Sequence, residues 1–225
     1  MKNPLFTGVC TALVTPFLNG EVNYPMLERL IARQLEGGVH AIVLCGTTGE
    51  APTLTDEEKR DIIARAKQVT GDDCLIIAGT GSNDTSHAVR LSRQAQEAGA
   101  DAVLLIAAML VPAEYRRLQK FAESLGLAVL SEAHTAGEIA MLLDNGASIV
   151  GVNARNLSTF ATDLGVVAEL MGRIPADKVR VSESALKSNA DLKQMKRLGA
   201  DAFLIGETLM RAASPGEKLC ELIAK

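Results

Sequence analysis

The chain has 225 residues, of which 48% are hydrophobic, 22% charged and 3% aromatic, and its formal net charge at pH 7 is −4. This composition supports a sizeable core and excludes a nucleic-acid binder that relies on a basic surface and an acidic disordered tail. The longest apolar stretches, 8–17 and 102–112, are too short to cross a bilayer, and the N-terminus lacks the apolar segment of a signal peptide. We therefore expect a cytoplasmic protein without nucleic-acid or membrane partners.

Eight short apolar runs, rich in β-branched residues, alternate with helical patterns along the chain. In chain order the expected strands are 9–17, 41–47, 75–80, 102–107, 128–134, 149–154, 179–184 and 202–206. Between them, apolar residues recur at the i, i+3 and i+4 spacing of a helix, glycines mark the helix ends, and Pro25 and Pro112 stand at helix starts. Thr55 and Glu58 form a capping box before the second helix.

Eight strand–helix units in this length give about 28 residues for each unit, which is the period of a short (βα)8 barrel. An open doubly wound sheet is the alternative, but it usually has fewer strands, and its dinucleotide-binding members carry a glycine fingerprint after the first strand. Here that strand ends in Thr15-Pro16-Phe17. The formula Gly-Ala-Asp-Ala occurs at 99–102 and again at 199–202, which fits an internally repeated barrel. We predict one α/β domain over 1–225, a TIM barrel of eight parallel strands.

Cysteine and histidine are sparse and show no ligand spacing. The four cysteines form no CxxC pair and are interpreted as reduced thiols, with disulfides or a metal site as the alternative. The three histidines are far apart in sequence, and we expect neither a metal, nor a cofactor, nor a Ser/His/Asp constellation with an orienting group. These residues are Cys10, Cys45, Cys74, Cys220, His40, His87 and His134.

The working residues of such a barrel follow the C-terminal ends of its strands. After the last two strands stand Ser184-Ala185 and Gly206-Glu207, where this architecture often binds phosphate through loop backbone and a helix N-terminus. We therefore predict a phosphate or sulfate site there. The alternative is that these small residues only end strands and cap helices.

A second polar group comes from the fifth, sixth and seventh strands: Glu132, Asn153, Arg155 and Glu183. Two carboxylates, an amide and a guanidinium at one mouth form a candidate acid–base and substrate-orienting set, and a structural ion pair is the alternative. No lysine ends a strand, and Lys187 is the only one near the mouth. The sequence therefore lacks the desolvated amine that Schiff-base chemistry requires.

The first part of the chain resembles dihydrodipicolinate synthase and its pyruvate-aldolase relatives. The resemblance is carried by the motifs TALVTPF at 11–17, GTTGEAPTLT at 46–55 and IAGTGSN at 77–83. It implies that Thr47 and Thr48 are remnants of a pyruvate site. In that family the threonines pass protons through tyrosines, and a lysine on the sixth strand forms the Schiff base. The resemblance therefore also calls for these tyrosines and this lysine, and both are missing from the sequence.

The rest of the chain resembles indole-3-glycerol-phosphate synthase. The resemblance is carried by AVLLI at 102–106, SEAHT at 131–135, VGVNARNL at 150–157, VSES at 181–184 and FLIGETLM at 203–210. It implies that Glu132 is a general base and that Asn153, Arg155 and Glu183 are active-site residues. Ser184, Gly206 and Glu207 match the phosphate loops, where Ala185 replaces a glycine at little cost unless its φ is positive.

The two resemblances together imply an engineered chimera, with units one to three from residues 1–100 and units four to eight from 101–225; a natural hybrid is the alternative. The catalytic lysines that the second resemblance implies are missing as well. We therefore expect a monomeric scaffold that retains a phosphate half-site for an anion or a phosphorylated small molecule. A weak lyase of the indole-3-glycerol-phosphate synthase type or, less expected, a pyruvate-dependent aldolase is the alternative.

Overall fold

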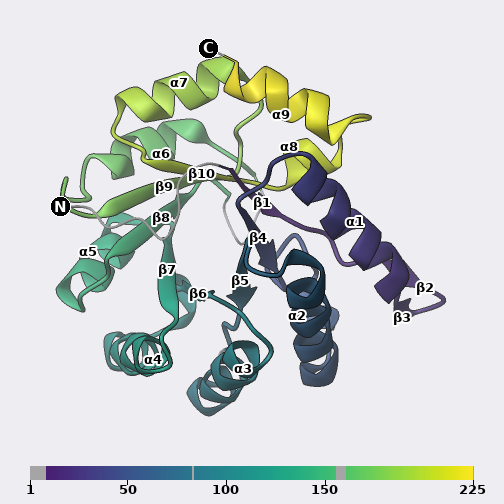
Figure 1. The fold of residues 1–225 in the computed structure, drawn as a ribbon. Helices are drawn as coiled ribbons and strands as arrows, with labels where there is room; N and C mark the ends of the chain where they lie inside the picture. Colours follow the sequence, from purple (N-terminus) through teal and green to yellow (C-terminus); the bar gives the residue numbers. More distant parts are fainter. Residues whose placement is uncertain (1–8, 83, 156–160, 225) are drawn as a thin grey trace.

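The computed structural model describes residues 9–82, 84–155 and 161–224, and its eight parallel strands close into a barrel (Figure 1). Each strand pairs with its neighbours in chain order, and β10 returns to pair with β1. The strands are β1 (Cys10–Ala12), β4 (Ala41–Leu44), β5 (Leu75–Gly79), β6 (Ala102–Ile106), β7 (Ala128–Ala133), β8 (Ile149–Asn153), β9 (Val179–Glu183) and β10 (Ala202–Ile205). The predicted (βα)8 barrel is confirmed.

Helices surround the barrel on its outside (Figure 1). They are α1 (Tyr24–Glu36), α2 (Asp56–Thr70), α3 (Thr85–Glu97), α4 (Pro112–Ser124), α5 (Ala136–Asp144), α6 (Leu164–Met171), α7 (Asn189–Arg197), α8 (Glu207–Met210) and α9 (Pro215–Ile223), with 3₁₀ turns at Ala51–Thr53 and Ala107–Met109. The predicted capping box is present, because Thr55 and Glu58 each accept the other's backbone N–H at 3.1 and 2.8 Å. Among the described residues, no helix is long and apolar enough to cross a membrane.

The first strand is shorter than predicted. Only Cys10–Ala12 joins the barrel, and the chain then forms a separate two-stranded hairpin from β2 (Phe17–Leu18) and β3 (Glu21–Val22). Pro16 has no N–H to offer a ladder, and Asn19 and Gly20 take positive φ values of 55° and 87°, as a tight hairpin turn requires. The expectation of one strand over 9–17 is therefore wrong at its C-terminal end.

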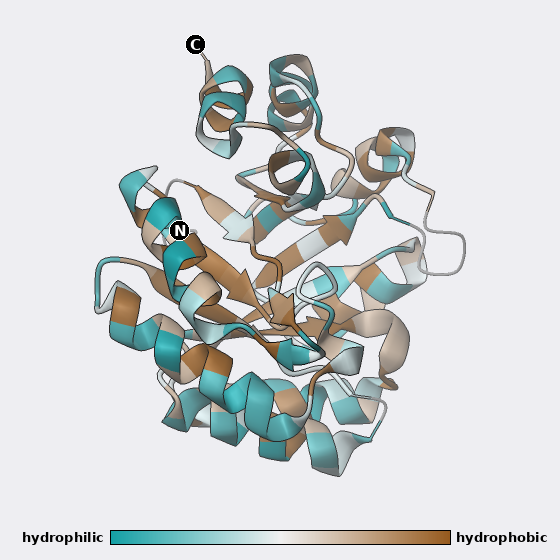
Figure 2. Cartoon of the chain, turned by 90° about the vertical axis from the view of Figure 1, so that its right-hand side faces the viewer, coloured by the Kyte–Doolittle hydropathy of each residue, from teal (hydrophilic) through white to brown (hydrophobic). Residues whose placement is uncertain are grey.

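The apolar residues of the barrel form two layers. Alternate strand residues such as Ile42 and Val103 cluster with helix residues such as Leu27, so they face outward against the helices. The residues between them, such as Val43 and Leu104, cluster only with other strands, so they fill the barrel interior. Figure 2 shows the hydrophobic strands enclosed by helices whose outer faces are largely hydrophilic.

The repeated Gly-Ala-Asp-Ala formula has the same structural role at both positions. Gly99 and Gly199 end helices with φ values of 99° and 98°, which favour glycine. The carboxylates of Asp101 and Asp201 then accept the backbone N–H of Ile76 and Arg180, at 2.8 and 2.9 Å, on the preceding strand. The internal repeat therefore marks a helix end and the docking of the next strand.

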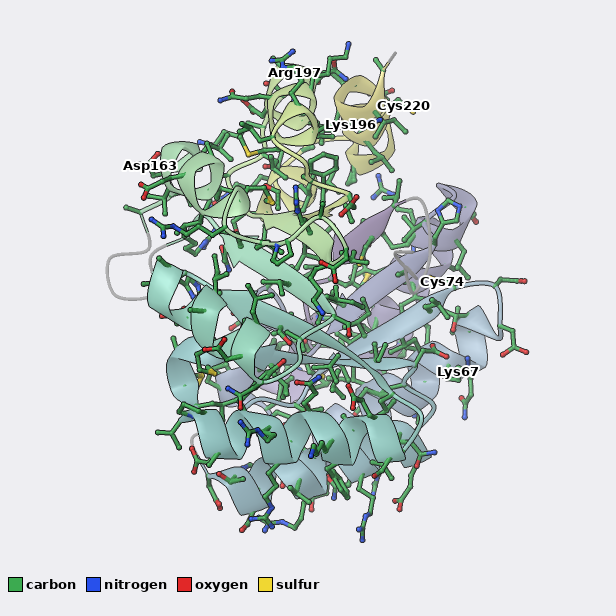
Figure 3. The ribbon with its side chains drawn as sticks, turned by 90° about the vertical axis from the view of Figure 1, so that its left-hand side faces the viewer. Lys67, Cys74, Asp163, Lys196, Arg197 and Cys220 are labelled. Carbon is green, nitrogen blue, oxygen red and sulfur yellow. The ribbon has the colours of Figure 1, made fainter. Side chains whose placement is uncertain are left out.

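All four cysteines are unpaired, as predicted. Burial raises the pKa of the Cys45 thiol to about 12 and that of Cys74 to about 11. Cys220, on α9, is exposed, and Figure 3 shows it far from the barrel strands. Buried thiols with raised pKa values are poor nucleophiles, so Cys45 and Cys74 belong to the packing of the molecule.

Candidate active site

Two carboxyl groups meet in the barrel interior at the C-terminal end of the strands. Glu132 on β7 lies opposite Gly151 on β8, and Glu183 follows on the other side, on β9. Because Gly151 has no side chain, an oxygen of Glu183 occupies the place where a Cβ atom would stand. The two carboxyl groups lie close enough there to shift each other's pKa, and the residues are only 5% and 1% exposed. Neither Glu183 oxygen has a hydrogen-bond partner within the described residues.

The surroundings separate the pKa values of the two carboxyl groups. Burial, together with the charge of Glu132, raises the pKa of Glu183 well above its usual range. Burial also opposes ionisation of Glu132, but the neighbouring side chains of His134, Glu183 and Asn153 outweigh it and lower the pKa of Glu132. The surroundings thus favour the protonated form of Glu183 and the ionised form of Glu132, an arrangement that suits one group as acid and the other as base.

His134 joins this pair from the segment after β7. Its Nε2 lies 3.2 Å from Glu132 Oε1, and its Nδ1 lies 3.6 Å from an oxygen of Glu138. Burial lowers the pKa of the imidazole, but the two glutamates outweigh it and raise the pKa above its ordinary value. Our sequence reasoning missed His134 and Glu138. The available signal was Thr135, which caps α5. Glu138 is the third residue of that helix, and its carboxylate accepts the His134 backbone N–H.

Arg155 lies apart from the carboxyl pair. Strand β8 ends at Asn153, whose side-chain oxygen accepts the Arg155 backbone N–H at 2.9 Å. The Arg155 guanidinium pairs with Glu207, which also accepts a hydrogen bond from Arg211 at 2.8 Å. These two arginines lower the pKa of Glu207. The structure therefore brings Glu132, Asn153 and Glu183 together, and it pairs Arg155 with Glu207 across the mouth.

The loop after β9 has an unusual backbone. Ser184 and Ala185 take positive φ values of 65° and 57°. The Ser184 N–H donates to the Leu204 carbonyl at 3.2 Å, and the Thr208 hydroxyl donates to the Leu186 carbonyl at 2.8 Å. These bonds hold the loop against the start of α8, so the two predicted anion-binding loops are neighbours.

The two threonines of the loop after β4 differ in position. Thr47 is exposed, whereas Thr48 is half-buried. A Cβ atom added to Gly206 would stand 2.8 Å from the Thr48 hydroxyl and 3.0 Å from Ala12. Thr48 therefore borders the predicted phosphate loop at the point where the barrel closes.

The barrel strands contain no lysine. The lysines in the described part of the chain lie on α2, α4, α7 and α9 or beside the two ends of β9, and Figure 3 shows Lys67 and Lys196 on the outer helices. Within the same residues, no group of three or more His, Cys, Asp or Glu side chains could hold a metal ion. The groups that the interior offers are therefore carboxyl and amide groups, without an amine.

The expectation that no Ser/His/Asp constellation exists is wrong. Ser82, His87 and Asp56 form a hydrogen-bonded line from the loop after β5 to the start of α2. No spacing in the sequence marks it, because Asp56 and His87 come from different βα units.

Replacing Ala185 with glycine is expected to raise the free energy of unfolding by about 1 kcal/mol, because a left-handed backbone is costly for a residue with a Cβ atom. Urea unfolding measures this difference. The matched control is Ala140→Gly on the exposed face of α5. This substitution should lower the free energy of unfolding by about 1 kcal/mol. A loss of stability at both positions would show that Ala185 is not strained.

Both parts of the chain match known protein families. The family model described as "Indole-3-glycerol phosphate synthase" matches residues 89–222, and that described as "Dihydrodipicolinate synthetase family" matches residues 5–132. The two matches overlap over 89–132. Each covers more than half of the chain, and together they cover nearly all of it.

Individual relatives divide the chain in the same way. The indole-3-glycerol phosphate synthase of Alkaliphilus metalliredigens is 50% identical over 129 residues, 57% of this chain and 49% of that protein. The 4-hydroxy-tetrahydrodipicolinate synthase of Acetivibrio thermocellus is 48% identical over 106 residues, 47% of this chain and 36% of that protein. The chain thus spans half or less of the length of these relatives.

The fold has relatives among solved structures as well. The crystal structure of dihydrodipicolinate synthase from Aquifex aeolicus superposes with a TM-score of 0.72 and 27% identity, over 96% of this chain and 75% of that one. The chain belongs to the dihydrodipicolinate synthetase family over its N-terminal part and to the indole-3-glycerol phosphate synthase family over its C-terminal part.

Proposed function

We propose that the chain is an engineered chimeric barrel that binds phosphate or a phosphorylated small molecule and has no efficient natural activity. The observation that carries this proposal is the composition of the mouth. The carboxyl pair and the loops that are proposed to bind an anion stand on a barrel whose strands contain no lysine. The protein is further proposed to be cytoplasmic and monomeric.

The missing amine matters for both families. A pyruvate aldolase needs a lysine to form a Schiff base with its keto acid, and the sixth barrel strand, β8, reads Ile-Val-Gly-Val-Asn. The indole-forming reaction is expected to use a lysine of the third barrel strand, β5, which ends at Gly79. A side chain at Gly79 would overlap the Cys45 carbonyl group. The backbone here therefore opposes a lysine at the end of this strand.

The anion site rests on four residues from two adjacent loops: Ser184, Ala185, Gly206 and Glu207. Within the described part of the chain, neither the Ser184 hydroxyl nor the Ala185 N–H has a protein partner, so both are available to an anion. The Glu207 carboxylate would repel an anion, but the arginines at positions 155 and 211 neutralise it. Glu207 is proposed to contribute its backbone N–H.

A titration of the ¹⁵N-labelled protein with inorganic phosphate tests the site. The amide resonances of these four residues should shift with saturation, and those of the exposed hairpin residues 17–21 should stay in place. The variant Ser184→Ala should bind phosphate more weakly, while Ser124→Ala on α4 should leave binding unchanged. If millimolar phosphate moves none of the four resonances, the chain has no phosphate site.

A weak lyase is the second candidate, and the contact of Glu132 with Glu183 and His134 favours it. A buried carboxylate beside a protonated carboxyl group is a competent acid–base pair. The pyruvate-dependent alternative has less support, because only Thr47 and Thr48 remain of its site. Borohydride reduction in the presence of pyruvate tests that alternative: we expect no increase in protein mass.

A further inference from the structure

A serine, a histidine and an aspartate line up on the other side of the barrel mouth, separate from the carboxyl pair. Ser82 lies in the loop after β5, His87 in the first turn of α3, and Asp56 in the first turn of α2. Ser82 Oγ is 3.2 Å from His87 Nδ1, and His87 Nε2 is 2.8 Å from both oxygens of Asp56. The three groups therefore form one continuous hydrogen-bonded chain.

The neighbouring groups determine which atom donates and which accepts in each of these two hydrogen bonds. Asp56 is a carboxylate and can only accept, so His87 Nε2 carries the proton between them and Nδ1 of the neutral ring is left as an acceptor. The Asp84 backbone N–H already donates to Ser82 Oγ at 3.1 Å. The hydroxyl proton of Ser82 is therefore free to point at Nδ1, as in an activated serine.

The position of the group allows a substrate to reach it. The His87 and Asp56 side chains are 28% and 31% exposed, and Ser82 is half-buried. The first turn of α3 begins just beyond Ser82. Asp84 caps it by accepting the Ser86 N–H at 2.9 Å, so the N–H groups left for a substrate are those that the cap does not use. The orientation of this turn is held by the Thr85 hydroxyl, which donates to Glu114 of α4 at 2.6 Å.

We propose that Ser82 is the nucleophile of a second site that hydrolyses small activated carboxylic esters. Ser82 Oγ attacks the carbonyl carbon while its proton passes to His87 Nδ1. The bond to the leaving oxygen then breaks, and that oxygen takes the proton from Nδ1. Water repeats the sequence at the acyl carbon, which releases the acid and restores Ser82. Asp56 acts through His87 and is a positioning residue.

Hydrolysis of p-nitrophenyl acetate by the whole chain tests the proposal. Ser82→Ala and His87→Gln should each lower the saturable rate at least about tenfold, because a positioned general base typically contributes 10²–10⁴-fold. Asp56→Asn should lower the rate and change its pH profile. Mass spectrometry of protein quenched during turnover should find one acetyl group on Ser82.

Two control variants remove similar groups elsewhere, His40→Gln and Ser124→Ala, and both should keep the full rate. The unfolding midpoints of Ser82→Ala and of the unmodified chain are compared as a folding control. If they are equal, a lower rate in the variant reflects the missing hydroxyl group and not loss of folded protein. A rate that survives in Ser82→Ala, or acetyl groups found only on other residues, would overturn the proposal.

Discussion

Replacing Gly151 with alanine is expected to lower the free energy of unfolding by about 2–3 kcal/mol, as overpacking of a buried site does. The added methyl group would stand where Glu183 now places a carboxyl oxygen. Glu183 would have to move within a buried site where neither of its carboxyl oxygens has a hydrogen-bond partner among the described residues.

The sign of this effect is diagnostic. Alanine in place of glycine otherwise stabilises a folded chain by reducing the freedom of the unfolded one. Gly137 on α5 has no neighbour within 4 Å of an added Cβ atom, so Gly137→Ala should raise the free energy of unfolding by about 0.5–1 kcal/mol. If Gly151→Ala is also stabilising in urea unfolding, the carboxyl group of Glu183 does not lie over β8.

Replacing Glu183 with glutamine is expected to remove a large pH dependence of stability. The folded-state pKa of Glu183 is raised by burial and by Glu132. Its stabilising contribution is therefore complete below the unfolded-state pKa of about 4.3 and is lost as the pH rises toward the folded-state value, by about 1.4 kcal/mol for each pH unit. Glutamine does not titrate, so the variant should not show this loss.

The window from pH 5 to 6 isolates this effect. Glu132, whose pKa is lowered, loses its contribution only as the pH falls below about 4.3. His134, whose pKa is raised, loses its contribution only as the pH rises above about 6.5. Urea unfolding at several pH values compares the chain with Glu183→Gln and with the exposed control Glu97→Gln. Parallel curves for all three proteins would contradict a protonated Glu183.

The barrel itself was predictable because its signals are local. Strand-like runs, the glycines that end helices and the capping box at Thr55 each depend on a few neighbouring residues. The hairpin at 17–22 was missed although Asn19-Gly20 is a strong turn signal, because the apolar run before it was interpreted as one strand. Local patterns thus specify most of this fold.

The sequence allowed us to predict which strand residues meet at the site, but not how the loop residues around them are arranged. Parallel strands bring their C-terminal ends together, and this indicated that Glu132, Asn153 and Glu183 meet. The pairing of Arg155 with Glu207 and the positive φ of Ala185 depend on loop geometry that no spacing encodes. The line from Ser82 to Asp56 joins two separate units and was missed for the same reason.

Turnover of a phosphorylated indole precursor tests the central claim most directly. The chain has a buried carboxyl pair and a proposed anion-binding mouth but no lysine on its barrel strands. Indole fluorescence should therefore stay at background, at the same pH and ionic strength as the phosphate titration but without added phosphate. Formation of the indole product at a rate that disappears in Glu132→Gln would contradict this account. It would show that the carboxyl pair and His134 are sufficient for catalysis.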